Sequence, residues 1–142
     1  MGRAAQGVKA MNLKKGDELV GADVVPANEK PARTTGAVRS GGEAELLAVT
    51  ENGFGKKTAL KEYRVQKRGG SGIKTAKITP KTGSLVAAKV IGGECTELIA
   101  ISKKGQVIRT PLNNISTLSR ATQGVRIMKL APQDALASIT CL

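Results

Sequence analysis

Short apolar runs, rich in Val, Ile, Leu and Ala, follow one another along the chain and are separated by Gly, Pro, Asn and charged residues. These turn residues interrupt the chain about every eight to twelve positions, a spacing typical of short strands. No segment keeps a helical period over the roughly eleven residues needed to define an amphipathic helix. The pattern therefore predicts an all-β protein built of short antiparallel strands.

Two segments have the pattern of a β-hairpin, and they are copies of each other. The first covers Glu45–Thr58 and the second Glu97–Thr110, each with an apolar run, a glycine turn and a second strand. The first turn, Glu51-Asn52-Gly53, contains Asn-Gly, the strongest short-range hairpin signal. Lys103-Lys104-Gly105 occupies the turn of the second copy. Both segments are expected to fold as antiparallel hairpins.

A basic segment containing a characteristic glycine occurs three times, over 2–9, 67–74 and 119–126. Each copy is expected to be a turn that leads into a strand, with apolar residues at the first, fourth and sixth positions after the glycine. Strict alternation cannot place the first and fourth positions on the same face of a sheet. A bulge near the second or third position would do so and would turn the basic residue of the second position outward. Those residues are Lys9, Lys74 and Arg126.

Each repeat is expected to hold four strands: two from the hairpin and two after the basic turn, such as Gly72–Ile78 and Leu85–Val90. Four strands in about 50 residues are typical of a propeller-like blade, whose small sheet packs against neighbouring sheets. The expected units are, in order, a partial blade, a loop or linker, a blade and a second blade, over 1–25, 26–44, 45–91 and 92–142. About two and a half blades are too few to close a ring. The chain is therefore interpreted as a piece of a longer polypeptide, or as one that associates to cover its open edges.

The composition excludes several kinds of site. The chain has no His, no Trp, one Tyr and one Phe, so a His-dependent triad, a His-containing zinc site and a row of aromatic base-stacking platforms are ruled out. No carboxylate pair recurs between the copies, and the glycine-rich segment lacks the Gly-Lys-Ser/Thr ending of a nucleotide-binding P-loop. We expect no catalytic site, no cofactor and no metal. Tyr63 aligns with Ile115 and is expected to be a half-buried strand residue, whereas Phe54 is expected to pack against a neighbour.

The two cysteines, Cys95 and Cys141, are far apart in the sequence and form no Cys-X-X-Cys spacing. This predicts reduced thiols rather than a disulfide framework or a metal cluster. No window approaches the roughly 18 continuous apolar residues of a membrane span, and no signal-peptide pattern is present. We therefore expect a soluble, intracellular protein with no membrane partner.

Positive charge is concentrated in one stretch. The chain carries 23 Lys and Arg against 11 Asp and Glu, a net charge of +12, and 52–82 alone holds nine basic residues and one acidic residue. Inside it, Gly69-Gly70-Ser71-Gly72 is expected to expose backbone N–H groups to a phosphate. A basic residue before the repeat glycine recurs as Arg3, Arg68 and Arg120. We expect successive blades to align these on one curved rim that binds DNA phosphates in a salt-dependent way, without reading base edges.

Two strings of the central segment, Glu51–Thr58 and Glu62–Lys74, resemble the C-terminal domain of the bacterial DNA gyrase A subunit. The flanking segments Gly2–Val25 and Ser119–Leu142 resemble other blades of that domain. The family's signature box is Gln-Arg-Arg-Gly-Gly-Lys-Gly, and Gln66–Gly72 differs from it at Lys67 and Ser71. The family's box lies in its first blade, whereas blade-like sequence precedes this one. The segment is therefore interpreted as a box-like copy in a later blade.

This resemblance implies a β-pinwheel, usually of six blades, in which neighbouring blades exchange a strand and a basic outer rim wraps double-stranded DNA. It also implies a supporting role in ATP-dependent negative supercoiling by a type IIA topoisomerase. The expected partners are DNA, the remainder of the gyrase A polypeptide, and gyrase B, in the bacterial cytoplasm at the nucleoid. The family's catalytic tyrosine and ATPase belong to other parts of the enzyme, so this chain is not expected to be an enzyme by itself.

The residues predicted to bind DNA are those of the box-like copy, the basic turns and the adjoining strands: Gln66, Lys67, Arg68, Gly69, Gly70, Ser71, Gly72, Lys56, Lys57, Arg64, Lys74, Arg3, Lys9, Arg109, Arg120 and Arg126. Two alternatives stay open. One is the corresponding C-terminal domain of topoisomerase IV, in which the box is typically degraded, so that Gln66 and Arg68-Gly69-Gly70 favour gyrase. The other is a basic repeat module that binds protein or RNA.

Overall fold

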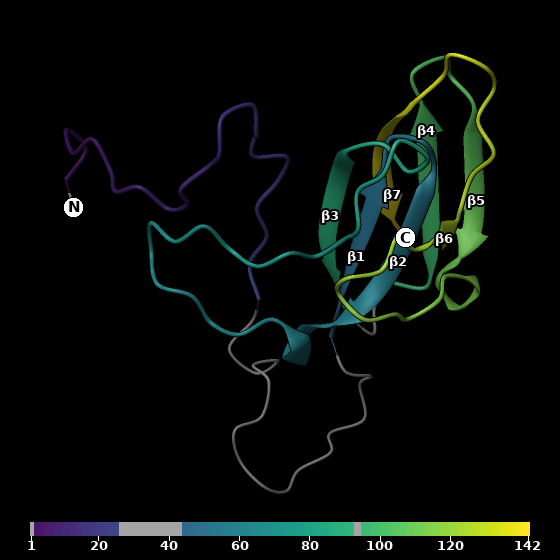
Figure 1. Ribbon diagram of the computed structural model, residues 1–142. Coiled ribbons are helices and arrows are strands. Elements are labelled where there is room, and N and C mark those ends of the chain that lie inside the picture. The colour runs from purple at the N-terminus through teal and green to yellow at the C-terminus, as the bar shows by residue number, and fades with distance from the viewer. Residues whose placement is uncertain (1, 26–43, 93–94) are drawn as a thin grey trace, which may run out of the picture.

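The computed structural model describes residues 2–25, 44–92 and 95–142, and it is built of antiparallel strands arranged in two sheets (Figure 1). The first sheet has the order β3-β1-β2-β6 and the second the order β5-β4-β7. The strands are β1 (Glu45–Thr50), β2 (Phe54–Ala59), β3 (Leu85–Ile91), β4 (Glu97–Ser102), β5 (Val107–Pro111), β6 (Val125–Arg126) and β7 (Leu136–Cys141). The predicted all-β class is confirmed.

Both predicted hairpins are present, and their turns use the glycines in the same way. Gly53 joins β1 to β2 with a φ of 78°, and Gly105 joins β4 to β5 with a φ of 85°. A residue with a Cβ adopts this left-handed backbone only at a cost, whereas glycine does so freely. Each hairpin is followed by one turn of 3-10 helix, η2 (Leu60–Glu62) or η3 (Leu112–Asn114), which the sequence patterns did not predict.

The core lies where the two sheets meet. Leu47, Val49 and Ile91 of the first sheet join Leu98 and Leu136 of the second in one buried cluster. The strands β3 and β7 lie against each other, so equivalent strands of consecutive blades are neighbours (Figure 1). Such a contact between copies is how a blade buries an apolar face that it cannot bury alone.

The short strand β6 completes the first sheet although it comes from the third basic turn. Val125 pairs with Gly55 of β2, and Arg126 pairs with Phe54. The N–H groups of Ile127 and Met128 then both donate to the carbonyl oxygen of Gly53, at 2.8 and 3.1 Å. Two consecutive residues opposite one partner are the mark of a β-bulge. The predicted bulge is confirmed in this copy, as is the strand exchange between blades, and Arg126 is exposed.

Two glycines allow this exchanged strand to approach β2. A Cβ on Gly124 would lie 2.6 Å from the carbonyl oxygen of Gly55, and Gly124 has a φ of 82°. A Cβ on Gly55 would meet the side chain of Ile127 and lie 2.8 Å from the Ala48 carbonyl oxygen. The glycine of the basic turn is therefore required both by its backbone conformation and by close packing.

Residues 2–25 are exposed and contain no strand. They contact the rest of the chain through a parallel bridge between Met11 and Gly70 and through the Asp23 carboxylate, which accepts the Val90 N–H at 3.0 Å. The partial blade over 1–25 stays a prediction, and the predicted linker lies outside the described residues except for Ala44. The strand expected over 72–78 is wrong. Within the described part of the chain no strand lies beside this segment as β2 lies beside β6, so it has no ladder to join.

The prediction of two free thiols is also wrong. Cys95 and Cys141 form a disulfide, with their Cα atoms 5.7 Å apart. The antiparallel pairing of β4 with β7 places Leu98 opposite Cys141, close to Cys95. Sequence spacing gave no sign of this, because strand register brings the two residues together. No helix in the described part of the chain has the length and the apolar composition that crossing a membrane requires.

Candidate nucleic-acid interface

The basic turn 119–122 is held in place by a lysine that is almost fully buried. Lys56 has 1% of its surface exposed, and its ammonium group donates to the carbonyl oxygens of Ser119 and Arg120, both at 2.5 Å, and to the Thr122 hydroxyl at 3.0 Å. Burial lowers the pKa of Lys56, as does the Arg120 charge, and Glu62 opposes the shift. Since all three donors are used inside the protein, the prediction that Lys56 binds DNA is wrong.

Arg120 connects this turn to the segment that precedes β3. Its backbone N–H donates to the Glu62 carboxylate at 3.2 Å, and its guanidinium donates to the Lys74 carbonyl oxygen at 3.4 Å. The guanidinium also lies 6.0 Å from the centre of the Tyr63 ring, within the range of a cation–π contact. The basic positions Arg120 and Lys74, from consecutive repeats, are therefore brought together, with Arg120 half-buried and Lys74 exposed.

Tyr63 itself is half-buried, as expected, but it ends η2 and is not part of a strand. Its hydroxyl is hydrogen-bonded to the Thr75 hydroxyl. The N–H of Lys77 adds a 3.0 Å hydrogen bond to the Thr122 carbonyl oxygen. These contacts fasten the segment after the box-like copy to the third basic turn. Tyr63 thus helps to connect the segment before β3 to the third basic turn.

The box-like loop, which we define as Gln66–Gly72, lies on the surface beside residues 2–25 (Figure 1). The Gly69 N–H donates to the Ala10 carbonyl oxygen at 2.9 Å, and the Gly70 N–H donates to the Lys67 carbonyl oxygen at 3.4 Å. The expectation that the N–H groups of Gly69 and Gly70 are offered to a phosphate is therefore wrong. The side chains of Gln66, Lys67, Arg68 and Ser71 are exposed, and Gly72 is partly covered.

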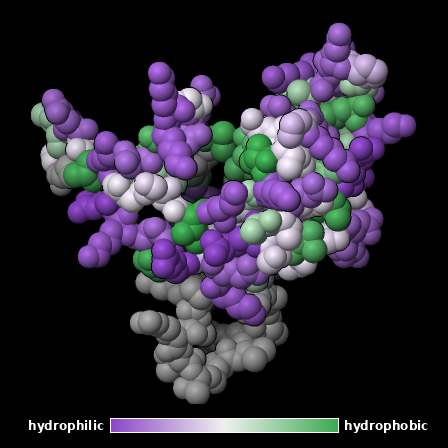
Figure 2. Space-filling view, viewed as in Figure 1, coloured by the Kyte–Doolittle hydropathy of each residue, from purple (hydrophilic) through white to green (hydrophobic). Residues whose placement is uncertain are grey.

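The other predicted residues are distributed over two regions. Arg64 is exposed just before the loop, and Arg3 and Lys9 are exposed in residues 2–25. Hydrophilic side chains project from the N-terminal segment and the neighbouring loop, at the left of Figure 2, with a few apolar residues between them. The alignment of Arg3, Arg68 and Arg120 on one rim stays a prediction.

Lys57 and Arg109 occupy equivalent positions in the two hairpins, and both form ion pairs. Lys57 lies 3.1 Å from the Glu45 carboxylate, and the Arg109 guanidinium is paired with Glu97. The Arg109 side chain is 64% exposed, whereas that of Lys57 is 14% exposed. A partner carboxylate reduces the positive charge that each residue offers to an anion. Their contribution to DNA binding stays a prediction.

Arg126 belongs to a second cationic group, which the predicted set of site residues contained only in part. Its guanidinium lies 5.3 Å from the centre of the Phe54 ring, and the Lys81 ammonium lies 5.6 Å from the same ring. Phe54 is buried, so the expectation that it packs against neighbours is confirmed. Lys81 lies within the basic stretch 52–82 but outside the repeated turns, and Lys129 follows the bulge. The charge density of 52–82 could have indicated Lys81 as a member of this cationic group. Only the fold shows that Lys129 lines the same pocket as Lys81.

Sequence comparison identifies relatives across nearly the whole chain. A family profile described as "DNA gyrase C-terminal domain, beta-propeller" matches residues 1–26, 44–91 and 96–142. The gyrase A protein of Staphylococcus epidermidis is 41% identical over 139 residues, and that of Thermotoga maritima is 39% identical over 139 residues. Each alignment covers 98% of this chain. The chain spans 14% and 15% of the length of these two relatives.

Solved structures give the same result for the fold. A structure of the DNA gyrase A C-terminal domain aligns with a TM-score of 0.64 and 30% identity, covering 69% of this chain and 33% of that one. A crystal structure of the C-terminal domain of DNA topoisomerase IV aligns with a TM-score of 0.61 and 23% identity, covering 70% of this chain and 30% of that one. The second likeness concerns the fold alone.

Proposed function

The chain belongs to the family of DNA gyrase C-terminal β-propeller domains, and from this premise we propose that it binds double-stranded DNA through the phosphate backbone and bends or wraps it. Binding of this kind depends on cationic side chains that can reach phosphates and release condensed counterions. Bending a site of 20–30 base pairs costs roughly 1 to 6 kcal/mol, which several phosphate contacts offset.

One observation supports the proposal most strongly. Of the nine basic residues between positions 52 and 82, seven are exposed, one is half-buried and one is buried. The exposed residues are Lys61, Arg64, Lys67, Arg68, Lys74, Lys77 and Lys81. A charge excess that served only the packing of the fold would be covered. Most of this one faces solvent, where a polyanion can meet it.

The two aromatic residues support binding without sequence preference. The chain contains one Phe and one Tyr and no Trp. Phe54 is covered by Lys81 and Arg126, and Tyr63 is approached by Arg120. Proteins usually hold single-stranded nucleic acids by stacking aromatic rings on the bases. Neither ring of this chain is free to stack in that way. Contacts to the phosphates of a duplex suit this surface better.

Within a complete gyrase, the proposed role is to present a wrapped DNA segment so that ATP-dependent strand passage introduces negative supercoils. The chain would supply no catalytic group, and its partners would be the remainder of the gyrase A polypeptide, and gyrase B, at the bacterial nucleoid in the cytoplasm. Identity of about two-fifths to gyrase A proteins favours gyrase over topoisomerase IV as the parent enzyme.

Titration of the chain with a fluorescent DNA duplex at several salt concentrations tests the proposal. We expect the logarithm of the binding constant to fall linearly with the logarithm of salt concentration, by about 0.9 for each phosphate contacted. Binding that does not respond to salt, or no binding at all, would refute the phosphate contact. Tighter binding to a structured RNA than to the duplex would instead favour an RNA-binding module.

A further inference from the structure

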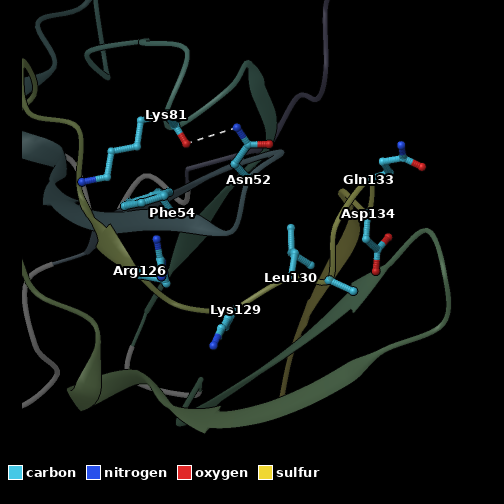
Figure 3. A pocket seen from close by; sticks show the side chains of 9 residues that line it. Asn52, Phe54, Lys81, Arg126, Lys129, Leu130, Gln133 and Asp134 are labelled. Carbon is cyan, nitrogen blue, oxygen red and sulfur yellow. Dashed lines mark hydrogen bonds between the residues drawn. The ribbon is translucent and has the colours of Figure 1, made fainter.

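A pocket of about 340 Å³ opens between the β1–β2 turn and the segment that connects β6 to β7. Figure 3 shows it from close by, with Asn52, Phe54 and Lys81 from residues 45–91 and Arg126, Lys129 and the residues after it from residues 92–142. The pocket thus exists only because the exchanged strand β6 pairs with β2. No one repeat contains all of its parts.

Positive charge lies on one side of this pocket. Lys81 and Arg126 lie beside Phe54, and Lys129 lies farther along, below Leu130, whereas Gln133 and Asp134 lie on the far side beyond Leu130 (Figure 3). All three cationic side chains belong to exposed residues. With one carboxylate among the charged lining residues, the pocket carries an excess of two positive charges.

The acidic residue of the lining, Asp134, is hydrogen-bonded to the protein backbone through one of its two carboxylate oxygens. One carboxylate oxygen of Asp134 accepts the N–H groups of Lys104, at 3.0 Å, and of Ala135, at 2.8 Å. Burial tends to raise the pKa of Asp134, but a side-chain hydrogen bond with Ser102, these backbone hydrogen bonds and the Lys104 charge leave it below its ordinary value. Asp134 therefore stays charged at neutral pH and holds the hairpin turn of the second blade.

The buried Phe54 ring restricts the positions of the Lys81 and Arg126 side chains. The ring is buried, with 5% of the residue exposed, and it lies within cation–π range of both Lys81 and Arg126. The Asn52 amide adds to this order because it donates to the carbonyl oxygens of Pro80 and Lys81, at 3.2 and 3.1 Å. Lysine and arginine side chains ordinarily lose much conformational freedom when they bind an anion. Here part of that ordering precedes binding.

We infer that this pocket, in which Lys81 and Arg126 flank Phe54 and Lys129 adds a third cation to the lining, is an anchoring site for a backbone phosphate of duplex DNA at the junction between two blades. The inference rests on the proposed function and adds a particular site to it, away from the box-like loop. A tetrahedral phosphate with its sugar fits a pocket at the small end of the range for ligand sites. Arginine and lysine are the side chains that bind phosphates by charge-assisted hydrogen bonds.

The test compares two triple variants that remove the same charge. In the pocket variant, Lys81→Gln, Arg126→Gln and Lys129→Gln are combined, and in the matched control Lys14→Gln, Lys15→Gln and Lys103→Gln are combined, all at exposed positions. Duplex binding is measured at several salt concentrations, with thermal unfolding to confirm that both variants fold. We expect the pocket variant to bind roughly 10- to 100-fold more weakly at low salt, a range set by the strength of a charged hydrogen bond. Its salt slope should be lower by about 0.9, and the control should retain most of the affinity.

A second measurement needs no substitution. Lysine acetylation of the unmodified chain, read by mass spectrometry, should be slowed at Lys81 and Lys129 by saturating duplex, with little change at Lys14 and Lys15. Equal affinities of the two variants together with unprotected Lys81 and Lys129 would overturn the anchoring site and leave the proposed function standing. If the unmodified chain itself fails to bind duplex, the proposed function fails first.

Discussion

The ammonium group of Lys56, in β2, lies 2.5 Å from the backbone carbonyl oxygen of Arg120, a residue 64 positions later in the chain. The two residues belong to different repeats, and both were expected on the DNA-binding surface. Instead one of them holds the backbone of the other. A buried charge that is fully hydrogen-bonded stabilises one particular arrangement of the groups around it, because removing either partner leaves the other unsatisfied.

Replacing Lys56 by Met should destabilise the chain by about 3 kcal/mol. The variant keeps much of the volume of the side chain but leaves the carbonyl oxygens of Ser119 and Arg120 without their donor, and bonds to charged groups contribute about 1.5–3 kcal/mol each. Urea unfolding gives the free energy. Lys89→Met, at an exposed position of β3, is the control and should change stability little. Equal stabilities of the two variants would contradict the role assigned to Lys56.

Gly124→Ala should destabilise the chain more than Gly105→Ala does. Both glycines have a positive φ, 82° and 85°, so both variants carry a backbone cost of about 1 kcal/mol. Only at Gly124 would the added methyl group also meet β2, 2.6 Å from the Gly55 carbonyl oxygen, whereas nothing lies within 4 Å at Gly105. The difference between the two thermal unfolding curves measures the contact between blades. Identical curves would mean that β6 can retreat from β2 without cost.

The disulfide between Cys95 and Cys141 closes a loop with a sequence separation of 46. Because the closed loop restricts the unfolded chain, the disulfide should stabilise the oxidised chain by about 4 kcal/mol. Unfolding of the oxidised chain with and without a reductant measures this difference. The double variant Cys95→Ser, Cys141→Ser is the control and should not respond to the reductant. Peptide mapping without reduction should recover Cys95 linked to Cys141, and two free thiols under oxidising conditions would show that the pairing does not form.

Asp134 should give the chain an acid-sensitive component of stability. Its pKa is lowered from the 3.8 of an ordinary Asp when the chain folds, so in acid the unfolded state binds more protons than the folded state and stability rises with pH. This stabilisation is fully present above about pH 3.8 and is lost as the pH falls through the folded value. Asp134→Asn should flatten that part of the curve of unfolding free energy against pH. An unchanged curve would place the acid sensitivity elsewhere.

Within a full-length gyrase A polypeptide assembled with gyrase B, Lys67→Ala combined with Arg68→Ala should reduce negative supercoiling more than it reduces relaxation. The two side chains are exposed on the box-like loop, and in the proposed role DNA wrapping serves to give strand passage its direction. Gel assays of both reactions on the same plasmid measure the two activities. Equal losses would indicate damaged folding or assembly rather than weaker wrapping.

Much of the fold could be predicted because the repeats carry local signals. Asn52-Gly53 fixes the first hairpin, and its copy at Gly105 uses the same positive φ. The bulge after Val125 followed from apolar positions that strict alternation could not place on one face. The strand over 72–78 could not be judged in this way, since its residues have a strand-like pattern but no neighbouring strand in the described part of the chain with which to pair.

The candidate site was less accessible from the sequence than the fold. Lys56 and Lys57 are adjacent and identical in type, and consecutive residues of a strand point to opposite faces. One is buried against the next repeat and the other is paired with Glu45. Lys129 joined Arg126 and Lys81 only because β6 crosses to the neighbouring sheet. A count of charges along the sequence cannot distinguish the buried or paired lysines from those that line the pocket.

The sequence by itself determined the all-β class, the repeat, the hairpin turns and a strong positive charge, because backbone conformation and alternation depend on residues close together in the chain and net charge depends on composition alone. Tertiary structure alone decided which cations face solvent, which backbone donors are already used and which cysteines meet. Those outcomes depend on contacts between residues such as Lys56 and Arg120, which are far apart in the chain. Their burial and hydrogen bonding arise only when separate repeats pack together.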